Sequence, residues 1–218
     1  MQCREKVRKT MSSTYKTIAE SSEAIFREKM SKFIAIARPV ETETEAKAAI
    51  DEVRNRYHDA RHVCWAYVLG ADKSRAMLND NGEPSGPAGK PIMGQINSFG
   101  LTNIVVCVVR YFGGIKLGTS GLIAAYREAT RLALEEARIV ERAEMTPLQV
   151  SFGYLAMNDV MKIVKSADLK ILEQHFDNSC VMTLAVRRDM ASDWVKRFGD
   201  VEGVTAETDG EVLRSTNA

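Results

Sequence analysis

The order of apolar and polar positions predicts strands at the start of the chain and a helix after them. Residues 15–40 hold two or three strand-like segments, and the last of these, residues 32–37, is half buried and closed by Pro39. Thr42 and Glu45 form a capping-box pattern at the start of a helix. Apolar residues then recur at helical spacing on one face: Ala46, Ala49, Ile50, Val53 and Tyr57.

The middle of the chain predicts two further strands around a short helix. Residues 62–69 are rich in β-branched and aromatic side chains, which favour a strand. A helix is expected over residues 91–98, because Pro91 suits the first helical position. The continuous apolar run of residues 103–110 is typical of a central strand that is buried on both faces.

A third, longer helix is predicted after a glycine-rich loop at residues 113–118. Thr119 or Ser120 can cap this helix, which should end near Arg138. Its buried stripe is expected to contain Leu122, Ala125, Tyr126, Ala129, Leu132 and Ala133.

The last third of the chain predicts the order strand, helix, strand, strand, helix, strand. The corresponding segments are residues 145–152, 159–167, 169–176, 180–186, 190–198 and 203–208. This βαββαβ order is ferredoxin-like, with two helices on one face of a sheet. The fold class expected for the whole chain is therefore α+β.

Charge divides the chain into two regions. Residues 1–142 carry 22 Lys and Arg against 17 Asp and Glu, whereas residues 143–218 carry 8 against 12. Because Pro147 and a new strand pattern also occur there, we place a domain boundary near residues 141–145. The predicted parts are a disordered leader, an N-terminal domain, a ferredoxin-like domain and a frayed tail: residues 1–14, 15–141, 145–210 and 211–218.

Composition favours a cytosolic protein without a membrane segment. Hydrophobic residues make up 45% of the chain, the formal net charge is +1, and no apolar run approaches the roughly 18 residues of a membrane span. The cysteines are far apart in sequence, as expected for reduced thiols in a core rather than a zinc site: Cys3, Cys64, Cys107 and Cys180. We expect no metal and no cofactor.

The stretch of residues 80–121 is distinctive because it combines glycine with cations. It holds nine of the fourteen glycines, and no Asp or Glu occurs between Pro84 and Arg127. Free backbone N–H groups and a helix N-terminus beside cations favour binding of phosphate or nucleic acid. The alternative is that the glycines only permit tight turns and close packing, with Ser120 as a helix cap.

The candidate anion or nucleic-acid ligands in this stretch are cations, hydroxyl groups, glycines and an aromatic residue. They are Lys90, Arg110, Tyr111, Gly113, Gly114, Lys116, Gly118, Thr119, Ser120 and Arg127. Tyr111 and Phe112 could stack on bases, although aromatic residues on strands are more often part of a core. A Walker-type phosphate loop is excluded, because proline replaces the glycine at Pro84 and the hydroxyl residue at Pro91.

The acidic loop of residues 80–86 admits three interpretations. A hydrolase would use Ser85 as nucleophile and His62 as base, if the strand of His62 adjoins the loop. A metal site would use the carboxylates of Asp80 and Glu83. The third interpretation, which we favour, is a turn in which Asn81 and Gly82 provide positive φ and Asp80 hydrogen-bonds to its own backbone.

Three ordered motifs identify a family resemblance. Residues 62–67 (HVCWAY), 79–91 (NDNGEPSGPAGKP) and 109–118 (VRYFGGIKLG) resemble the Impact/YigZ family over residues 15–140. The resemblance implies an N-terminal domain like the second domain of ribosomal small-subunit protein 5. It also implies a C-terminal domain like the fifth domain of elongation factor G. Eukaryotic members regulate translation initiation through protein contacts, so the resemblance implies a role in translation.

Taken together, the residues and the resemblance predict a cytosolic binding protein rather than an enzyme. The expected partner is RNA, the ribosome or another phosphate-rich ligand, and a protein partner in translation is also possible. The alternatives are an enzyme acting on a small phosphorylated or peptidic substrate, and a protein-interaction module. The pattern does not specify the oligomeric state.

Overall fold

The computed structural model describes residues 13–177, 179–209 and 213. The chain divides into two compact units, one of residues Tyr15–Arg142 and one of the described residues from Ala143 onward, with Ser13 and Thr14. Most of the predicted leader (residues 1–14) and tail (residues 211–218) lies outside the described residues. Only residues 13, 14 and 213 of these two segments are described. No helix in the described part of the chain is long and apolar enough to span a membrane.

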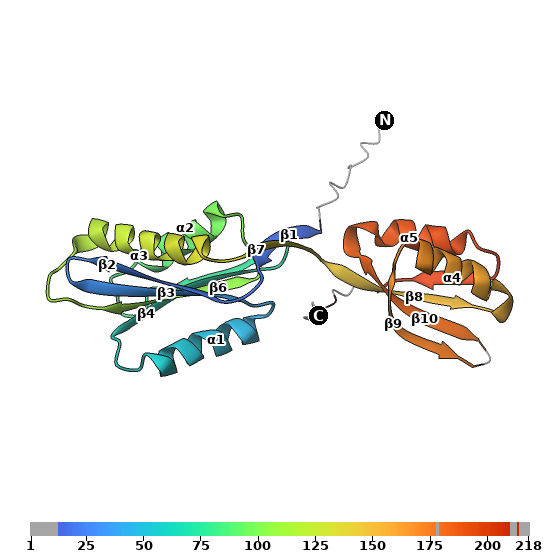
Figure 1. The fold of residues 1–218 in the computed structure, drawn as a ribbon, viewed down its shortest axis with the longest axis horizontal. Helices are drawn as coiled ribbons and strands as arrows, with labels where there is room; N and C mark the ends of the chain where they lie inside the picture. Colours follow the sequence, from blue (N-terminus) through green and yellow to red (C-terminus); the bar gives the residue numbers. More distant parts are fainter. Residues whose placement is uncertain (1–12, 178, 210–212, 214–218) are drawn as a thin grey trace, which may run out of the picture. The chain divides into compact units, whose positions relative to one another are not determined.

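The first unit is built on a five-stranded antiparallel sheet with the order β2-β3-β6-β4-β5 (Figure 1). The strands are β2 (Ser22–Glu28), β3 (Ser31–Pro39), β4 (His62–Leu69), β5 (Arg75–Asn79) and β6 (Ile104–Tyr111). The prediction of a central strand at residues 103–110 is confirmed, because β6 lies between β3 and β4 and is buried on both faces. The edge strand β5 was not predicted.

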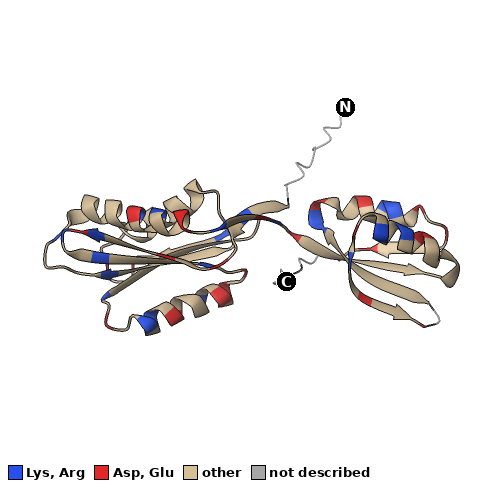
Figure 2. Ribbon diagram, viewed as in Figure 1, with Lys and Arg blue, Asp and Glu red and all other residues tan. Residues whose placement is uncertain are grey.

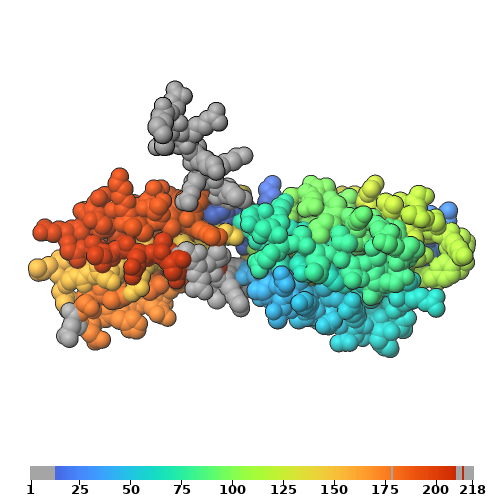
Figure 3. All heavy atoms as spheres, turned by 180° about the vertical axis from the view of Figure 1, so that it is seen from behind, coloured from blue at the N-terminus to red at the C-terminus, as the bar shows by residue number. Residues whose placement is uncertain are grey.

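Helices cover both faces of this sheet (Figure 1). The helix α1 (Glu43–Arg56) packs on one face, over β4 and β6, and its buried residues share a core cluster with Ile34 and Ile36 of β3. The helices α2 (Gly89–Ser98) and α3 (Gly118–Glu135) pack on the other face, where the ring of Tyr126 meets the ring of Phe33 edge to face at 5.2 Å. In the view from behind, the teal to green surface of β5 and α2 lies between α1 and the yellow-green start of α3 (Figure 3).

Helix starts agree only in part with the sequence. The capping prediction is confirmed for α1, because the Thr42 Oγ1 accepts a hydrogen bond from the Glu45 amide at 3.1 Å. The prediction that Thr119 or Ser120 caps α3 is wrong, since both lie inside its first turn and Leu117 is the N-cap residue. All of the predicted stripe is buried except Leu132, which is half buried.

A short two-stranded sheet joins distant parts of the chain. Strand β1 (Thr14–Ile18) pairs with β7 (Ile139–Ala143). Sequence reasoning did not predict β7, because it follows the long helix without a turn of clear glycine or proline character.

The second unit has the ferredoxin-like order. Its strands are β8 (Met145–Phe152), β9 (Lys170–Phe176), β10 (Cys180–Arg187) and β11 (Val204–Glu207), arranged as β11-β8-β10-β9. Helices α4 (Met157–Ser166) and α5 (Ala191–Gly199) complete the βαββαβ pattern. Two short 3-10 turns, Tyr154–Ala156 and Arg188–Met190, precede these helices. The predicted α+β class and the ferredoxin-like order are both confirmed.

Candidate nucleic-acid interface

The loop after β5 is organised by a single carboxylate. Asp80 Oδ1 accepts hydrogen bonds from the backbone N–H groups of Ala88 at 3.0 Å and Gly89 at 2.8 Å, and Oδ2 accepts one from Gly86 at 2.9 Å. Gly89 is the first residue of α2, so the negative charge at this helix N-terminus is supplied by the chain itself. Asn81 and Gly82 have φ of 38° and 85°, which agrees with the turn interpretation.

The environment of Asp80 keeps it ionised. Burial alone raises the pKa of this carboxyl, but the three backbone donors and the nearby Lys90 together hold the pKa below its usual range. Its oxygens are already satisfied, and no group of three or more candidate ligands for a metal ion occurs among the described residues.

A second carboxylate of the loop, Glu83, lies in a buried polar network. Its Oε1 accepts hydrogen bonds from Arg110 Nη1 at 2.6 Å and from the Tyr126 hydroxyl at 2.9 Å. The side chain of Glu83 is 3% exposed and that of Arg110 is 8% exposed. The thiol of Cys64 extends the network, with its Sγ 3.3 Å from the Tyr126 hydroxyl and 2.8 Å from the Asp80 carbonyl oxygen.

This network changes the role of Arg110. The sequence suggested an unopposed cation, but Glu83 lies just before the acid-free stretch and neutralises it, so that expectation is wrong for Arg110. The guanidinium also lies over the rings of Phe33 and Phe112, 5.6 Å from each centroid. Its Nε is buried and has no hydrogen-bond partner in the described part of the chain.

The hydrolase residues are close in the fold but are not connected. His62 lies beside the acidic loop, as the hypothesis required, and its Nδ1 is 3.2 Å from the Asn81 carbonyl oxygen. Ser85 is exposed, and no hydrogen bond joins it to His62 among the described residues. A Cβ on Gly82 would lie 3.2 Å from His62 Nδ1, so the imidazole packs against the turn.

The glycines before α3 have structural roles of their own. A Cβ on Gly113 would lie 2.1 Å from the carbonyl carbon of Met30, and its amide donates to Ser31 Oγ at 3.3 Å. Gly114 and Gly118 have φ of 87° and 69°, which side chains rarely adopt. The packing alternative from the sequence therefore accounts for these three glycines.

Tyr111 is engaged in a hydrogen bond. Its hydroxyl donates to Asp59 Oδ1 at 2.7 Å. This hydrogen bond to the carboxylate, together with burial, raises the pKa of Tyr111 to about 12. The neighbouring residue Phe112 is 53% exposed and is the aromatic residue open to solvent at the end of β6.

The surface that remains open is the α3 entry segment, which we define as residues 112–120. Lys116, Thr119 and Ser120 are exposed, and no side chain in the described part of the chain caps α3. No acidic residue lies in its first turn, and Figure 2 shows no red on the first turns of the helix. Two further predicted cations, Lys90 on α2 and Arg127 on α3, are also exposed.

Sequence reasoning missed two features next to this segment. The turn between β2 and β3 places Met30, 79% exposed, against Gly113, and both Lys29 and Met30 have positive φ. Ile115 is 51% exposed, so apolar side chains lie among the cations. Positive φ at two residues other than glycine gives no sequence signal, but the exposed Ile115 could have been noted beside Lys116.

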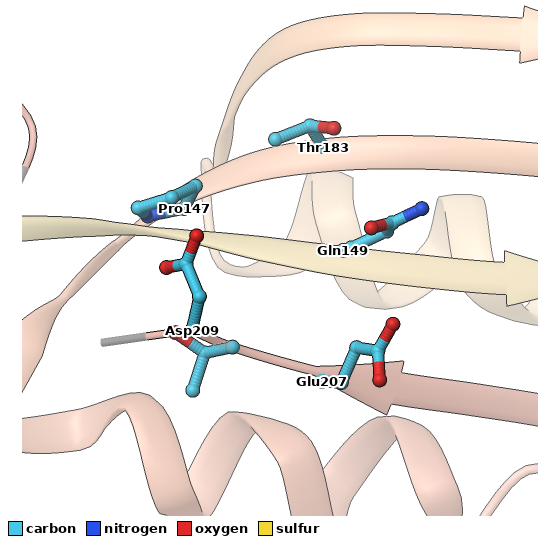
Figure 4. A pocket seen from close by; sticks show the side chains of 6 residues that line it. Pro147, Gln149, Thr183, Glu207 and Asp209 are labelled. Carbon is cyan, nitrogen blue, oxygen red and sulfur yellow. The ribbon is translucent and has the colours of Figure 1, made fainter. Parts of the chain in front are cut away.

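The second unit carries a shallow depression of about 450 Å³ that contains none of the predicted site residues (Figure 4). It lies on the sheet face opposite the core residues Leu148 and Val150. The lining residues are Pro147, Gln149, Thr183, Glu207, Thr208 and Asp209. Two carboxylates and no cation line it, which does not suit a phosphate.

Comparison with known proteins identifies the family. Residues 29–134 match the Impact N-terminal domain, and this range includes every predicted site residue. The IMPACT family member YigZ of Escherichia coli (strain K12) is 31% identical over 174 residues, which cover 79% of this chain and 85% of that protein. The chain belongs to the IMPACT family.

Other relatives of this IMPACT family protein agree. The IMPACT family member YvyE of Bacillus subtilis (strain 168) is 33% identical over 166 residues, 76% of each chain. A crystal structure described as that of a hypothetical protein has a TM-score of 0.68 and 28% identity, and covers 89% of this chain and 96% of that one. A match of this length includes residues of both units of this chain.

Proposed function

We propose that this IMPACT family protein is a cytosolic, non-enzymatic protein that binds RNA, including ribosomal RNA, through the α3 entry segment. The observation that carries the proposal is the start of α3. Its first turn has free backbone N–H groups, no acidic residue and no side-chain cap within the described residues, and Lys116, Thr119 and Ser120 lie exposed beside it. Such a helix N-terminus attracts a phosphate group.

The residues have distinct roles in this proposal. Lys116 supplies a point charge to a phosphate, and the hydroxyls of Thr119 and Ser120 supply donors. Arg127, exposed on the same helix, extends the positive surface along a nucleic-acid backbone. Lys90 contributes less, because Asp80 lies close enough to interact with its charge. Membership of the family supports a translation-related regulatory role at the family level, and RNA is the ligand that this surface fits.

The enzyme alternative has less support. All three hydrogen bonds to the Asp80 carboxylate come from the backbone of its own loop and of α2. Glu83 is held by Arg110 and Tyr126. In our proposal these carboxylates stabilise the fold.

The test is the salt dependence of RNA binding. Fluorescence anisotropy with a labelled RNA of mixed sequence should give an affinity that falls steeply as salt rises. Lys116→Ala and Arg127→Ala should each weaken binding and lower the slope by about one unit. Lys196→Ala, an exposed lysine on α5 in the second unit, is the matched control and should bind like the parent. If the Lys116 and Arg127 variants keep the parent's affinity and slope, the proposal is wrong.

A further inference from the structure

The exposed ring of Phe112 packs against the buried guanidinium of Arg110. Arg110 lies near the end of β6 and Phe112 directly follows that strand, and the Arg110 guanidinium is 5.6 Å from the Phe112 centroid. The same guanidinium is fixed by its 2.6 Å hydrogen bond to Glu83 and by the buried ring of Phe33. The ring of Phe112 therefore lies against a cation that also contacts Glu83 and Phe33.

The surroundings of the ring favour a nucleic acid over an apolar partner. Lys116 lies four residues after Phe112, and the turn with Lys29 and Met30 packs against Gly113. Lys116 and Lys29 are both exposed, and the Phe112 ring is 53% exposed. An exposed ring packed on a cation, in a segment that also carries an exposed lysine, is an arrangement that favours stacking on a base.

We infer that Phe112 stacks on an unpaired base of the bound RNA, so that the α3 entry segment selects single-stranded or loop RNA over duplex. This inference rests on the proposed function and specifies the class of RNA. In a duplex the bases are stacked on one another, so a side chain cannot reach their faces. Lys116 binds the phosphates of single-stranded and duplex RNA alike, whereas Phe112 stacks only on the bases of a single strand.

The decisive experiment compares Phe112 variants on two RNA probes of equal length, one single-stranded and one a perfect duplex. Phe112→Ala should weaken single-strand binding roughly 5- to 150-fold, the effect of losing one stacked base, and leave duplex binding unchanged. The salt slope should also stay as in the parent, because no phosphate contact is lost. Ile25→Ala, which removes a side chain that is 47% exposed on β2, is the control and should have no effect.

Two conservative variants separate stacking from apolar contact. Phe112→Tyr keeps a ring and should retain the parent's preference, whereas Phe112→Leu keeps apolar volume and should bind like the alanine variant. In Phe112→Trp, the added indole fluorescence should be quenched by single-stranded RNA. Unchanged thermal unfolding and far-ultraviolet circular dichroism establish that each variant is folded.

The outcomes distinguish failure of the inference from failure of the proposed function. If the parent binds neither probe, or if Lys116→Ala has no effect on either, RNA binding through this surface is wrong. If Lys116→Ala weakens both probes but Phe112→Ala alters neither, or weakens both equally, the stacking inference alone is overturned. Equal binding by Phe112→Leu and the parent also overturns it.

Discussion

The carboxylate of Asp80 lies 2.8 Å from the backbone amide of Gly89, nine residues further along the chain. This hydrogen bond places an internal anion at the N-terminus of α2. The two helices that begin in the glycine-rich stretch therefore differ, because within the described residues α3 has no such side-chain partner. An external anion is accommodated more easily at α3 than at α2, where it would compete with Asp80.

Substituting Asp80 tests its role as a structural anion. Asp80→Asn should lower the free energy of unfolding at neutral pH by about 1.5–3 kcal/mol, since the amide group cannot accept from all three N–H donors. Urea unfolding followed by circular dichroism measures this change. Asp51→Asn, which alters an exposed aspartate on α1, is the control and should leave stability close to that of the parent.

The pH dependence of this penalty follows from the sign of the pKa shift. Hydrogen bonding keeps the pKa of Asp80 in the folded state below its value in the unfolded chain. The stabilisation is therefore fully present above the unfolded pKa of about 4, and it is lost as pH falls through the folded pKa. The difference in free energy of unfolding between Asp80→Asn and the parent should therefore shrink as the pH falls. A difference that stays constant from pH 7 to pH 3 would contradict this account.

The ion pair of Glu83 and Arg110 is expected to be strongly coupled. Arg110→Met or Glu83→Leu alone leaves one buried charge without its partner and should cost roughly 3–5 kcal/mol. The double variant removes both charges and should be more stable than either single variant. A double-mutant cycle by urea unfolding measures the coupling. Arg131→Met, which breaks solvent-exposed pairs with Glu128 and Glu135, should change stability little. Additive effects at Glu83 and Arg110 would contradict the coupling.

The sequence was sufficient to predict the helices and strands that have a strong hydrophobic periodicity. The apolar run of β6 and the stripe of α3 were predicted because each buries a regular pattern of side chains. Strand β5 was missed, since as an exposed edge strand it has only one residue that is even partly buried, Leu78. The pairing of Glu83 with Arg110 spans 27 residues and depends on the sheet register, so local reasoning assigned Arg110 to the solvent-facing charges.

The buried thiols should be unreactive in the folded protein. Burial raises the pKa of Cys64 and of Cys107 to about 12, so little thiolate forms at pH 8. Alkylation by iodoacetamide, followed by mass spectrometry of peptides, should leave both residues unmodified in native buffer. Labelling should appear across the urea unfolding transition. Rapid labelling of Cys64 before that transition would indicate that the Tyr126 network opens locally.

The glycine at position 113 is required by the packing of two segments. Its missing Cβ would lie 2.1 Å from the Met30 carbonyl carbon, and backbone atoms cannot move aside as a flexible side chain can. Gly113→Ala should therefore displace the turn between β2 and β3 and lower stability by roughly 2–4 kcal/mol. Gly94→Ala on α2, where nothing lies within 4 Å of the added carbon, should instead gain roughly 0.5–1 kcal/mol through helix propensity. Thermal unfolding of the two variants should shift in opposite directions, and a Gly113→Ala protein as stable as the parent would mean that the turn does not pack against the loop in solution.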